Sequence, residues 1–308
     1  LLILKNASEK LDAGEMVLPE VEIQVRTHVA NAFESVHNFP LSLEQHERIQ
    51  VLENQVRGED HPLAVAVGIT RGRLLSWMNR SEEAIELWAA TRDRLLEVEG
   101  PDSHLNEVAT SYLARALSGL GRIEEGVAME EELLEKKRDR LGPEHPDVMA
   151  ALRALAHNYL ASGLFEQSSV AWLEFRAYSV AEHGPDHPDV LYADVQAANV
   201  RKGMGDLEEA IAQFEALLPR HEAAVGKNHP AYIQILSDLA STNFGLKRYE
   251  VALGYLKEGL PFTKALYGQS HKFTITTGAG ILACLKALNR PEEAAAFSDQ
   301  QMEAYIAS

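Results

Sequence analysis

The sequence predicts an all-α solenoid of about seven antiparallel helix pairs, because its turn signals recur at a constant interval. Glycines stand 42 residues apart, at Gly58, Gly100, Gly142, Gly184, Gly226 and Gly268. A second set of turn positions lies 21 residues after each glycine, at Asn79, Gly121, Gly163, Gly205, Lys247 and Asn289. A fixed period of this length is typical of stacked supersecondary units. Halving it leaves room for two helices of similar length in each unit.

Each of the 42-spaced glycines is followed by signals for the start of a helix. Histidine stands three residues after five of them, at His61, His145, His187, His229 and His271, and His104 comes one place late. Proline follows four of these histidines, and proline suits the first helical position because its backbone angle is already helical. We expect the glycine to end one helix and the histidine to bond locally at the start of the next.

The second turn in each unit also opens a helix. Acidic pairs follow it at Glu82-Glu83, Glu124-Glu125, Glu208-Glu209 and Glu292-Glu293. Negative charge is favourable in the first turn of a helix, where it faces the positive end of the helix dipole. Each unit is therefore predicted to be helix, tight turn, helix.

Small residues mark one position in each predicted helix. Fourteen residues after the glycine stand Gly72, Ala114, Ala156, Ala198, Ala240 and Leu282, and twenty-six residues after it stand Ala84, Gly126, Ser168, Ala210, Ala252 and Ala294; all but Leu282 are small. Small side chains at these two positions allow the paired helices to approach closely and interlock. We expect both positions to be buried where the two helices cross.

These two small positions, with a bulky residue such as Trp88 or Trp172 four places after the second, resemble the tetratricopeptide repeat. The 42-residue period and the run Gly-Pro-Glu-His-Pro-Asp-Val at 142–148 are similar to the long variety of kinesin light chains and many bacterial proteins. The resemblance covers nearly the whole chain. It implies a right-handed superhelix whose first helices line a concave groove, and a scaffold that is reused for many protein partners.

Two domains are expected along the chain. Residues 1–15 should form an N-terminal capping or linking helix, and residues 16–308 a repeat domain with repeats starting near 16, 58, 100, 142, 184, 226 and 268. Ala30 and Ser42 occupy the small positions of an eroded first repeat. The segments 11–14 and 19–22 are similar to the region that introduces such repeats behind the kinase domain of bacterial Ser/Thr protein kinases. The absence of an initial methionine suggests an excised fragment or a processed protein.

Composition narrows the classes of partner and the compartment. The formal net charge of −17 argues against general binding to nucleic acid, which requires clustered Lys and Arg. No apolar run is long enough for a membrane span, so we expect no membrane partner. A single cysteine, Cys284, fits a reducing compartment and predicts a cytoplasmic protein. The charged stretch 130–138 is interpreted as a solvated outer face, and the oligomeric state stays open.

No catalytic, metal or cofactor site is predicted. Histidines at equivalent positions of successive repeats should form a line along the stack, whereas a metal ion needs a cluster. His183 and His187 are near ligand spacing, but we expect the Gly184-Pro185 break between them to destroy the helical register of such a pair. The sequence contains no serine elbow and no convincing nucleophile–base pairing, so we expect no enzyme activity.

A peptide-binding groove is predicted from the face that the resemblance assigns to the first helices. Its groove positions lie 8, 11, 12, 15 and 18 residues after each glycine, and the first five members of the column at 15 are all polar. Arginine and amide side chains would suit an extended acidic peptide. In the alternative reading, these arginines pair with glutamates of adjacent helices. The predicted groove residues are Asn31, Arg73, Arg115, Arg153, His157, Gln196, Asn199 and Lys202.

Three functional hypotheses follow. The first is a non-catalytic scaffold that binds a linear peptide segment of a partner protein in the groove. The second is a regulatory or sensor module of a larger bacterial signalling protein such as a Ser/Thr kinase, and the third, ranked last, is an enzyme. The paired groove asparagines of kinesin light chains are replaced here, for example by Arg153-Ala154, so we do not expect the same cargo specificity.

Overall fold

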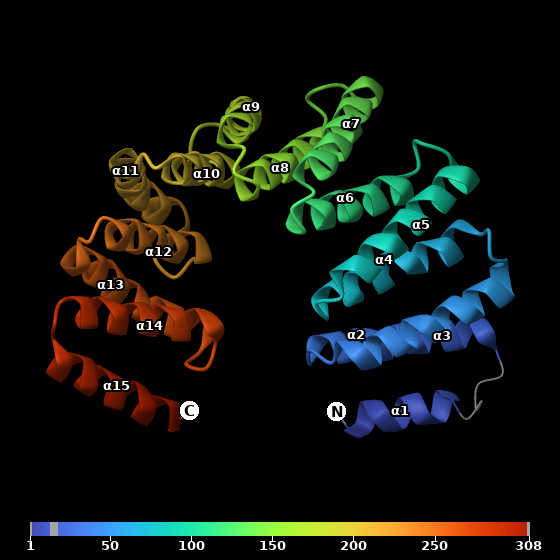
Figure 1. Ribbon diagram of the computed structural model, residues 1–308, viewed down its shortest axis with the longest axis horizontal. Helices are drawn as coiled ribbons and strands as arrows, with labels where there is room; N and C mark the ends of the chain where they lie inside the picture. The colour runs from blue at the N-terminus through green and yellow to red at the C-terminus, as the bar shows by residue number, and fades with distance from the viewer. Residues whose placement is uncertain (1, 13–17, 307–308) are drawn as a thin grey trace. The chain divides into compact units, whose positions relative to one another are not determined.

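The computed structural model describes residues 2–12 and 18–306, and in these ranges the chain forms fifteen α-helices and no strand (Figure 1). The helices are α1 (Leu2–Asp12), α2 (Pro19–Ser35), α3 (Phe39–Arg57), α4 (Pro62–Trp77), α5 (Ser81–Glu99), α6 (His104–Gly119), α7 (Ile123–Leu141), α8 (Pro146–Ala161), α9 (Phe165–His183), α10 (Pro188–Met204), α11 (Leu207–Val225), α12 (Pro230–Gly245), α13 (Tyr249–Tyr267), α14 (Lys272–Ala287) and α15 (Pro291–Ile306). Among them, none combines the length and apolar character that a membrane span requires.

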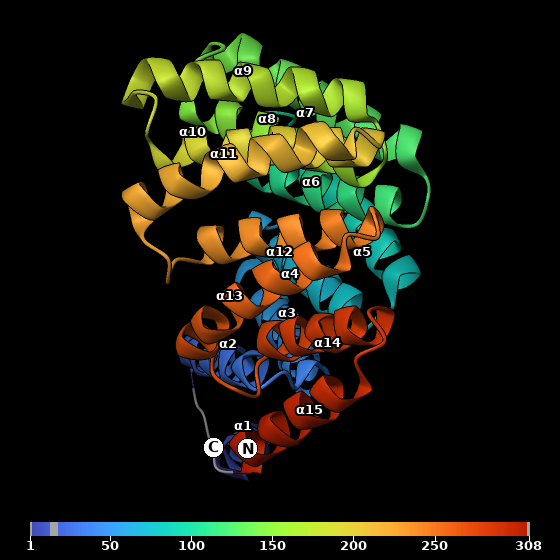
Figure 2. The same cartoon turned by 90° about the vertical axis from the view of Figure 1, so that its left-hand side faces the viewer.

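The helices group into two compact units, residues 1–151 and 152–308, with the border inside α8. Within each unit, helices that follow one another in the sequence pack side by side as antiparallel neighbours (Figure 1). In the first unit α2, α4 and α6 form one layer, and α3, α5 and α7 form the other. In the second unit α10, α12 and α14 form one layer and α9, α11, α13 and α15 the other, and Figure 2 shows the latter four helices in chain order from α9 at the top to α15 at the bottom. The predicted all-α solenoid of helix pairs is confirmed.

Every helix joint at a 42-spaced glycine has the same backbone geometry. At Gly142, for example, φ is 89° and ψ is 153°, in a region that is essentially restricted to glycine. The histidine three residues later then caps the next helix: the Nδ1 atom of His187 accepts a hydrogen bond from the backbone N–H of Asp189 at 3.2 Å. In the unit where histidine comes one place late, the hydroxyl of Ser103 serves as the cap. The predicted role of the histidines as local joint residues is confirmed.

The turn in the middle of each unit is left-handed whatever residue occupies it. Gly121, Asn79 and Lys247 all have positive φ, with 60° at Lys247. After Lys247, the backbone N–H of Arg248 donates to the carbonyl of Asn243 at 2.9 Å, which is the six-residue hydrogen bond of a Schellman motif. The position in the period therefore imposes the turn even where the residue is not glycine.

The small positions lie where the paired helices cross. Ala114, Ala156, Ala198, Ala84 and Ala210 are all fully buried. Gly126 shows why small size is needed: a Cβ atom added there would lie 2.3 Å from the carbonyl oxygen of Ala114. Large side chains fill the neighbouring space, because close helix packing leaves grooves that only bulky groups can occupy. The principal ones are Trp88, Trp172 and Phe214.

Helix α1 is joined to the first repeat by a buried arginine. Arg26 of α2 is 2% exposed, and its guanidinium contacts Asp12 of α1 at 2.9 Å, Glu22 at 2.8 Å and Gln45 of α3 at 2.9 Å. Ala30 and Ser42 are fully buried, as predicted for the eroded first repeat. The expected domain border near residue 15, the expected repeat start near 16, and residues 13 and 14 of the kinase-like segment lie outside the described residues.

The close approach at Gly126 predicts a strong effect of one methyl group. Gly126→Ala should lower the free energy of unfolding by about 2–3 kcal/mol, because the new Cβ overlaps the backbone of α6 and helix backbones cannot shift locally. Gly119→Ala is the matched control: it lies in the last turn of α6 with open space around the added atom, and should change stability by less than about 1 kcal/mol. Urea unfolding followed by circular dichroism measures both. Equal effects of the two substitutions would contradict close packing as the role of Gly126.

Candidate functional site

Two neighbouring cavities lie on the first-helix layer of the second unit, and we call this face the second-unit groove. The larger, of about 550 Å³, is lined mainly by residues of α10 and α12, together with Arg153 of α8 and residues of α11, α13 and α14. The other, of about 350 Å³, is lined mainly by α12, α13 and α14. Pro230 and Gln234 of α12 border both cavities, as do Tyr267 of α13 and Phe273 of α14.

Part of the lining of these cavities comes from the predicted groove positions. They lie 8, 11, 12, 15 or 18 residues after the preceding 42-spaced glycine, because a constant period turns the same helix face toward the same side. The lining residues at these positions are Tyr192, Gln234 and Thr276; Arg153, Val195 and Ser237; Gln196 and Gly280; Ser241 and Ala283; and Phe244. The predicted face of the first helices is therefore the face that carries the cavities.

The walls of the second-unit groove combine apolar and amide groups. Tyr192, Phe244 and Phe273 are partly exposed, with 36%, 39% and 46% of their surface accessible. Gln196 and Gln234 line the larger cavity together with Tyr192 and Phe273, and Gln234 also lines the smaller one. Such walls can bury apolar side chains while the amides bond to a peptide backbone.

Two aromatic residues of the groove were missed by the sequence analysis. Tyr267 ends α13, and Phe273 lies in the first turn of α14, so both flank the joint at Gly268 rather than the middle of a first helix. The predicted groove positions all lie in the middle or the last turns of each first helix, so they leave out its first turn. A signal was present, because aromatic or imidazole residues gather around this joint, with the rings of Tyr267 and His271 stacked at 4.8 Å.

Arg153 differs from the other arginines of the second unit. Its side chain is exposed and lines the larger cavity, and no carboxylate lies within ion-pair distance of it among the described residues. The remaining arginines of residues 152–308 each contact at least one carboxylate; they are Arg176, Arg201, Arg220, Arg248 and Arg290. An uncompensated positive charge thus borders a largely apolar cavity in an acidic protein.

His157 and Tyr192 form a neutral hydrogen-bonded pair beside Arg153. The Nε2 atom of His157 lies 2.5 Å from the Tyr192 hydroxyl, and the imidazole packs edge-on against Trp172 at 4.8 Å. Burial lowers the pKa of His157, and the nearby charge of Arg153 lowers it further. Burial raises the pKa of Tyr192, an effect that Arg153 opposes. The pair holds Tyr192 at the cavity wall.

Lys202 and Arg73 form ion pairs within the protein, as the alternative interpretation of the predicted groove cations expects. The Nζ atom of Lys202 donates to the Ser241 hydroxyl at 2.7 Å and lies 3.3 Å from Asp238, so it joins α10 to α12. Arg73 contacts Glu34 at 3.2 Å, and its guanidinium covers the Trp77 ring at 4.5 Å. These two cations are already paired within the protein.

The other predicted groove residues lie in different parts of the structure. Asn31 lines a shallow hollow of about 690 Å³ in the first unit, beside Glu34 and Trp77. Arg115 is exposed and has no carboxylate partner among the described residues; its guanidinium lies 5.0 Å from the Tyr112 ring. Gln196 lines the larger second-unit cavity, and Asn199 is half-buried on the same helix. Peptide contact by any of the eight predicted residues stays a prediction.

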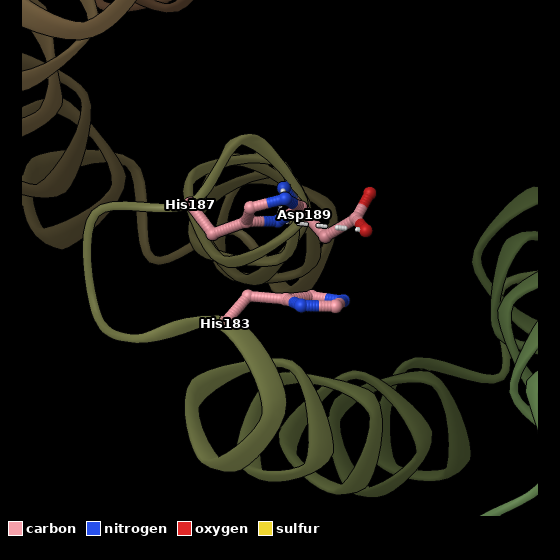
Figure 3. Close-up of side chains that lie close together, drawn as sticks. All are labelled: His183, His187 and Asp189. Atoms are coloured by element: carbon pink, nitrogen blue, oxygen red, sulfur yellow. Dashed lines mark hydrogen bonds and ion pairs between the residues drawn. The ribbon is translucent and has the colours of Figure 1, made fainter.

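The Gly184-Pro185 break ends the helical register between His183 and His187, as expected, but the two side chains nevertheless lie together. Their rings lie 4.2 Å apart, and Asp189 stands beside them (Figure 3). Gly184 has a φ of 85°, and this backbone turns the chain so that the residue before the glycine meets the residue three places after it. The break is thus what brings the two histidines together.

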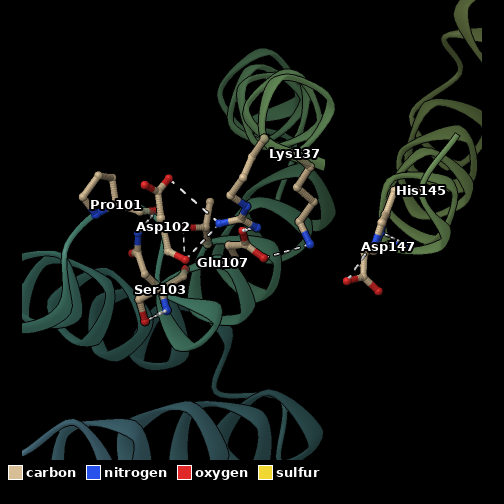
Figure 4. A network of polar contacts seen from close by, with 10 residues as sticks. Pro101, Asp102, Ser103, Glu107, Lys137, His145 and Asp147 are labelled. Carbon is tan, nitrogen blue, oxygen red and sulfur yellow. Dashed lines mark hydrogen bonds and ion pairs between the residues drawn. The ribbon is translucent and has the colours of Figure 1, made fainter. Parts of the chain in front are cut away.

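The interpretation of residues 130–138 as a solvated outer face holds for Glu131, Glu132, Glu135 and Lys136, which are exposed, but not for Glu130 and Lys137. Glu130 is buried, and Lys137 lies 2.9 Å from the buried carboxylate of Glu107 on α6. Arg140 contacts the same carboxylate at 2.6 Å. Figure 4 shows Lys137 reaching toward Glu107 from the neighbouring helix. These charges hold α7 against α6 and have a structural role.

Arg153 should control the protonation of His157. In Arg153→Gln the pKa of His157 is expected to rise toward its ordinary value, because one of the two causes that depress it is removed. Titration of the imidazole resonances by NMR measures the shift. Arg248→Gln, which removes an exposed arginine paired with Glu208, is the control and should leave the His157 titration unchanged. An unchanged His157 titration in Arg153→Gln would contradict the electrostatic contact.

Comparisons with known proteins agree with this architecture. Residues 108–147 and 189–265 match tetratricopeptide-repeat family models, whereas no curated protein matches the chain. Among solved structures, a Podosopora anserina putative kinesin light chain with nearly identical TPR-like repeats has a TM-score of 0.56 at 20% identity, over 67% of this chain and 97% of that one.

Two signalling proteins have the same fold. NprR in complex with its cognate peptide NprX has a TM-score of 0.55 at 12% identity, covering 98% of this chain and 84% of NprR. A signal transduction ATPase with a tetratricopeptide repeat sensor from Pyrococcus horikoshii has a TM-score of 0.52 at 15% identity, covering 91% of this chain and 46% of that one. The segments 108–147 and 189–265 are therefore tetratricopeptide repeats, and these solved structures, all at 20% identity or less, share with the chain the fold of stacked helix pairs.

Proposed function

We propose that the protein is a non-catalytic scaffold that binds a linear segment of a partner protein in the second-unit groove. The observation that carries this proposal is Arg153, an arginine without a carboxylate partner at the edge of a cavity of about 550 Å³. Elsewhere in the second unit, arginines are neutralised by acidic neighbours. A cation left open at an apolar cavity is suited to an acidic group from another molecule.

The walls of the groove define the chemistry of the segment. Tyr192, Val195 and Phe273 offer apolar surface for a large aliphatic or aromatic side chain. Gln196 and Gln234 can exchange hydrogen bonds with the backbone of an extended chain, which would otherwise lose its bonds to water. Arg153 can form a two-bond pair with a carboxylate. The preferred segment therefore carries a large apolar residue near an acidic one.

The comparisons support a peptide ligand in general terms. NprR, which shares the fold, is described in complex with its cognate peptide. At 12% identity this likeness extends to the fold alone, so the acidic character of the ligand rests on Arg153. The repeat sensor of the Pyrococcus horikoshii ATPase leaves a regulatory module of a larger signalling protein, such as a Ser/Thr kinase, as the alternative.

We also propose a compartment, and we propose that the protein works without a cofactor. Cys284 is a buried free thiol, which supports a reducing cytoplasmic compartment. At the groove, His157 holds the Tyr192 side chain in place through its hydrogen bond to the hydroxyl. The proposed binding function requires neither a cofactor nor a reaction.

A peptide pair tests the groove. We would measure fluorescence anisotropy of two labelled 12-residue probes that differ only in Asp against Asn on either side of a central Phe. The protein is expected to bind the Asp probe more tightly, and Arg153→Gln should weaken that probe by about tenfold, the loss of one charge-assisted contact, while leaving the Asn probe unchanged.

Arg248→Gln is the matched control, because Arg248 is exposed, paired with Glu208 and outside both cavities. It should leave both affinities unchanged. Equal binding of the Asp probe by the parent protein and Arg153→Gln would refute the proposed contact. Equal weakening by the two variants would indicate a general effect of net charge.

A further inference from the structure

We propose that the joint between α9 and α10 binds one divalent transition-metal ion through His183, His187 and Asp189. Each residue offers a ligand atom, and these atoms all lie within 4.8 Å of one another. His183 ends α9, His187 caps α10, and Asp189 lies in its first turn, so three ligands from two helices meet at one loop (Figure 3). Asp189 also lines the larger cavity of the second-unit groove, whereas His183 and His187 do not, so the proposed metal site adjoins the peptide contact proposed at Arg153.

The donor set fits a borderline-soft cation. Two imidazoles and one carboxylate match the ligands of zinc sites that keep a fourth position open for water. His183 is exposed and the other two residues are half-buried, so an ion can enter directly from solvent. Asp186, the remaining acid within the joint, is paired with Arg220 at 3.4 Å and is left out of the ligand set.

The other repeats show which residue completes the site. At the preceding joint, His145 and Asp147 repeat the His-Pro-Asp sequence, with Nδ1 and Oδ2 3.9 Å apart (Figure 4), but the residue before Gly142 is Leu141. At the last joint, Tyr267 takes the place of His183 and stacks on His271. The joints at Gly184 and Gly268 both bring two rings together. Among the described residues, however, the joint at Gly184 is the one that combines two histidines with an aspartate.

An ion bound through the Nδ1 atom of His187 would displace a local hydrogen bond. In the metal-free protein the Nδ1 atom of His187 accepts from the backbone N–H of Asp189 at 3.2 Å, and the Asp189 carboxylate lies 3.6 Å from the same nitrogen. An ion bound at this nitrogen replaces the cap hydrogen bond with a coordination bond. Pro188 still opens the helix, because its backbone angle is independent of the cap.

Calorimetric titration of the untagged chain with zinc chloride tests the site. The parent protein should bind one zinc ion per chain in its tightest class of sites. His183→Tyr should weaken this class at least tenfold while keeping the joint intact, because it recreates the Tyr267–His271 stack. Asp189→Ala should weaken it as well, whereas Asp147→Ala at the equivalent joint should leave it unchanged.

A gain of binding provides the second arm. Leu141→His supplies the missing ligand beside His145 and Asp147, and should raise the stoichiometry to two zinc ions per chain. Nitrogen-15 spectra of the imidazoles should show zinc shifting His183 and His187 before His229 or His271. Unaltered zinc binding by His183→Tyr, absence of a one-to-one class in the parent protein, or equal shifts at all joint histidines would each overturn the proposal.

Discussion

The structure depends on a glycine backbone at the end of every second helix. These glycines have φ between 81° and 95°, where a side chain would be strained, and so each of them lets the chain leave one helix and enter the next within a few residues. The histidine or serine that follows then caps the new helix through its own side chain. Because this joint recurs at a constant interval, successive first helices within a unit turn the same positions to the same face.

The local parts of this arrangement could be predicted from the sequence because a few neighbouring residues determine them. The helix pairs, both kinds of turn, the histidine caps and the buried small positions all follow from spacing and residue type. Lys247 is an instructive case: lysine has no preference for a left-handed backbone, yet it adopts a φ of 60°. Its place in the period predicted the turn better than its identity did.

The contents of the candidate site could be predicted only in part. Several of the predicted groove positions line the two cavities, because helical periodicity determines which face a residue occupies. Whether a cation on that face is free depends on an acid elsewhere in the chain: Arg73 meets Glu34 and Lys202 meets Asp238, whereas Arg153 meets no carboxylate in the described structure. The same limit applies to His183 and His187, since a helix-based reading of their spacing ignores the turn at Gly184 that brings them together.

The central claim is that one 42-residue period is a complete structural unit, and an internal deletion tests it most directly. Removal of residues 226–267 joins Val225 to Gly268, which restores the joint and brings α14 to the place of α12. Removal of the half period 226–246 instead makes one second helix follow another, so that unlike faces meet. We predict that circular dichroism will show unchanged helicity per residue and cooperative unfolding for the first deletion, and a loss of both for the second. Equal losses in the two deletions, or retention of both properties by the half-period deletion, would contradict the account.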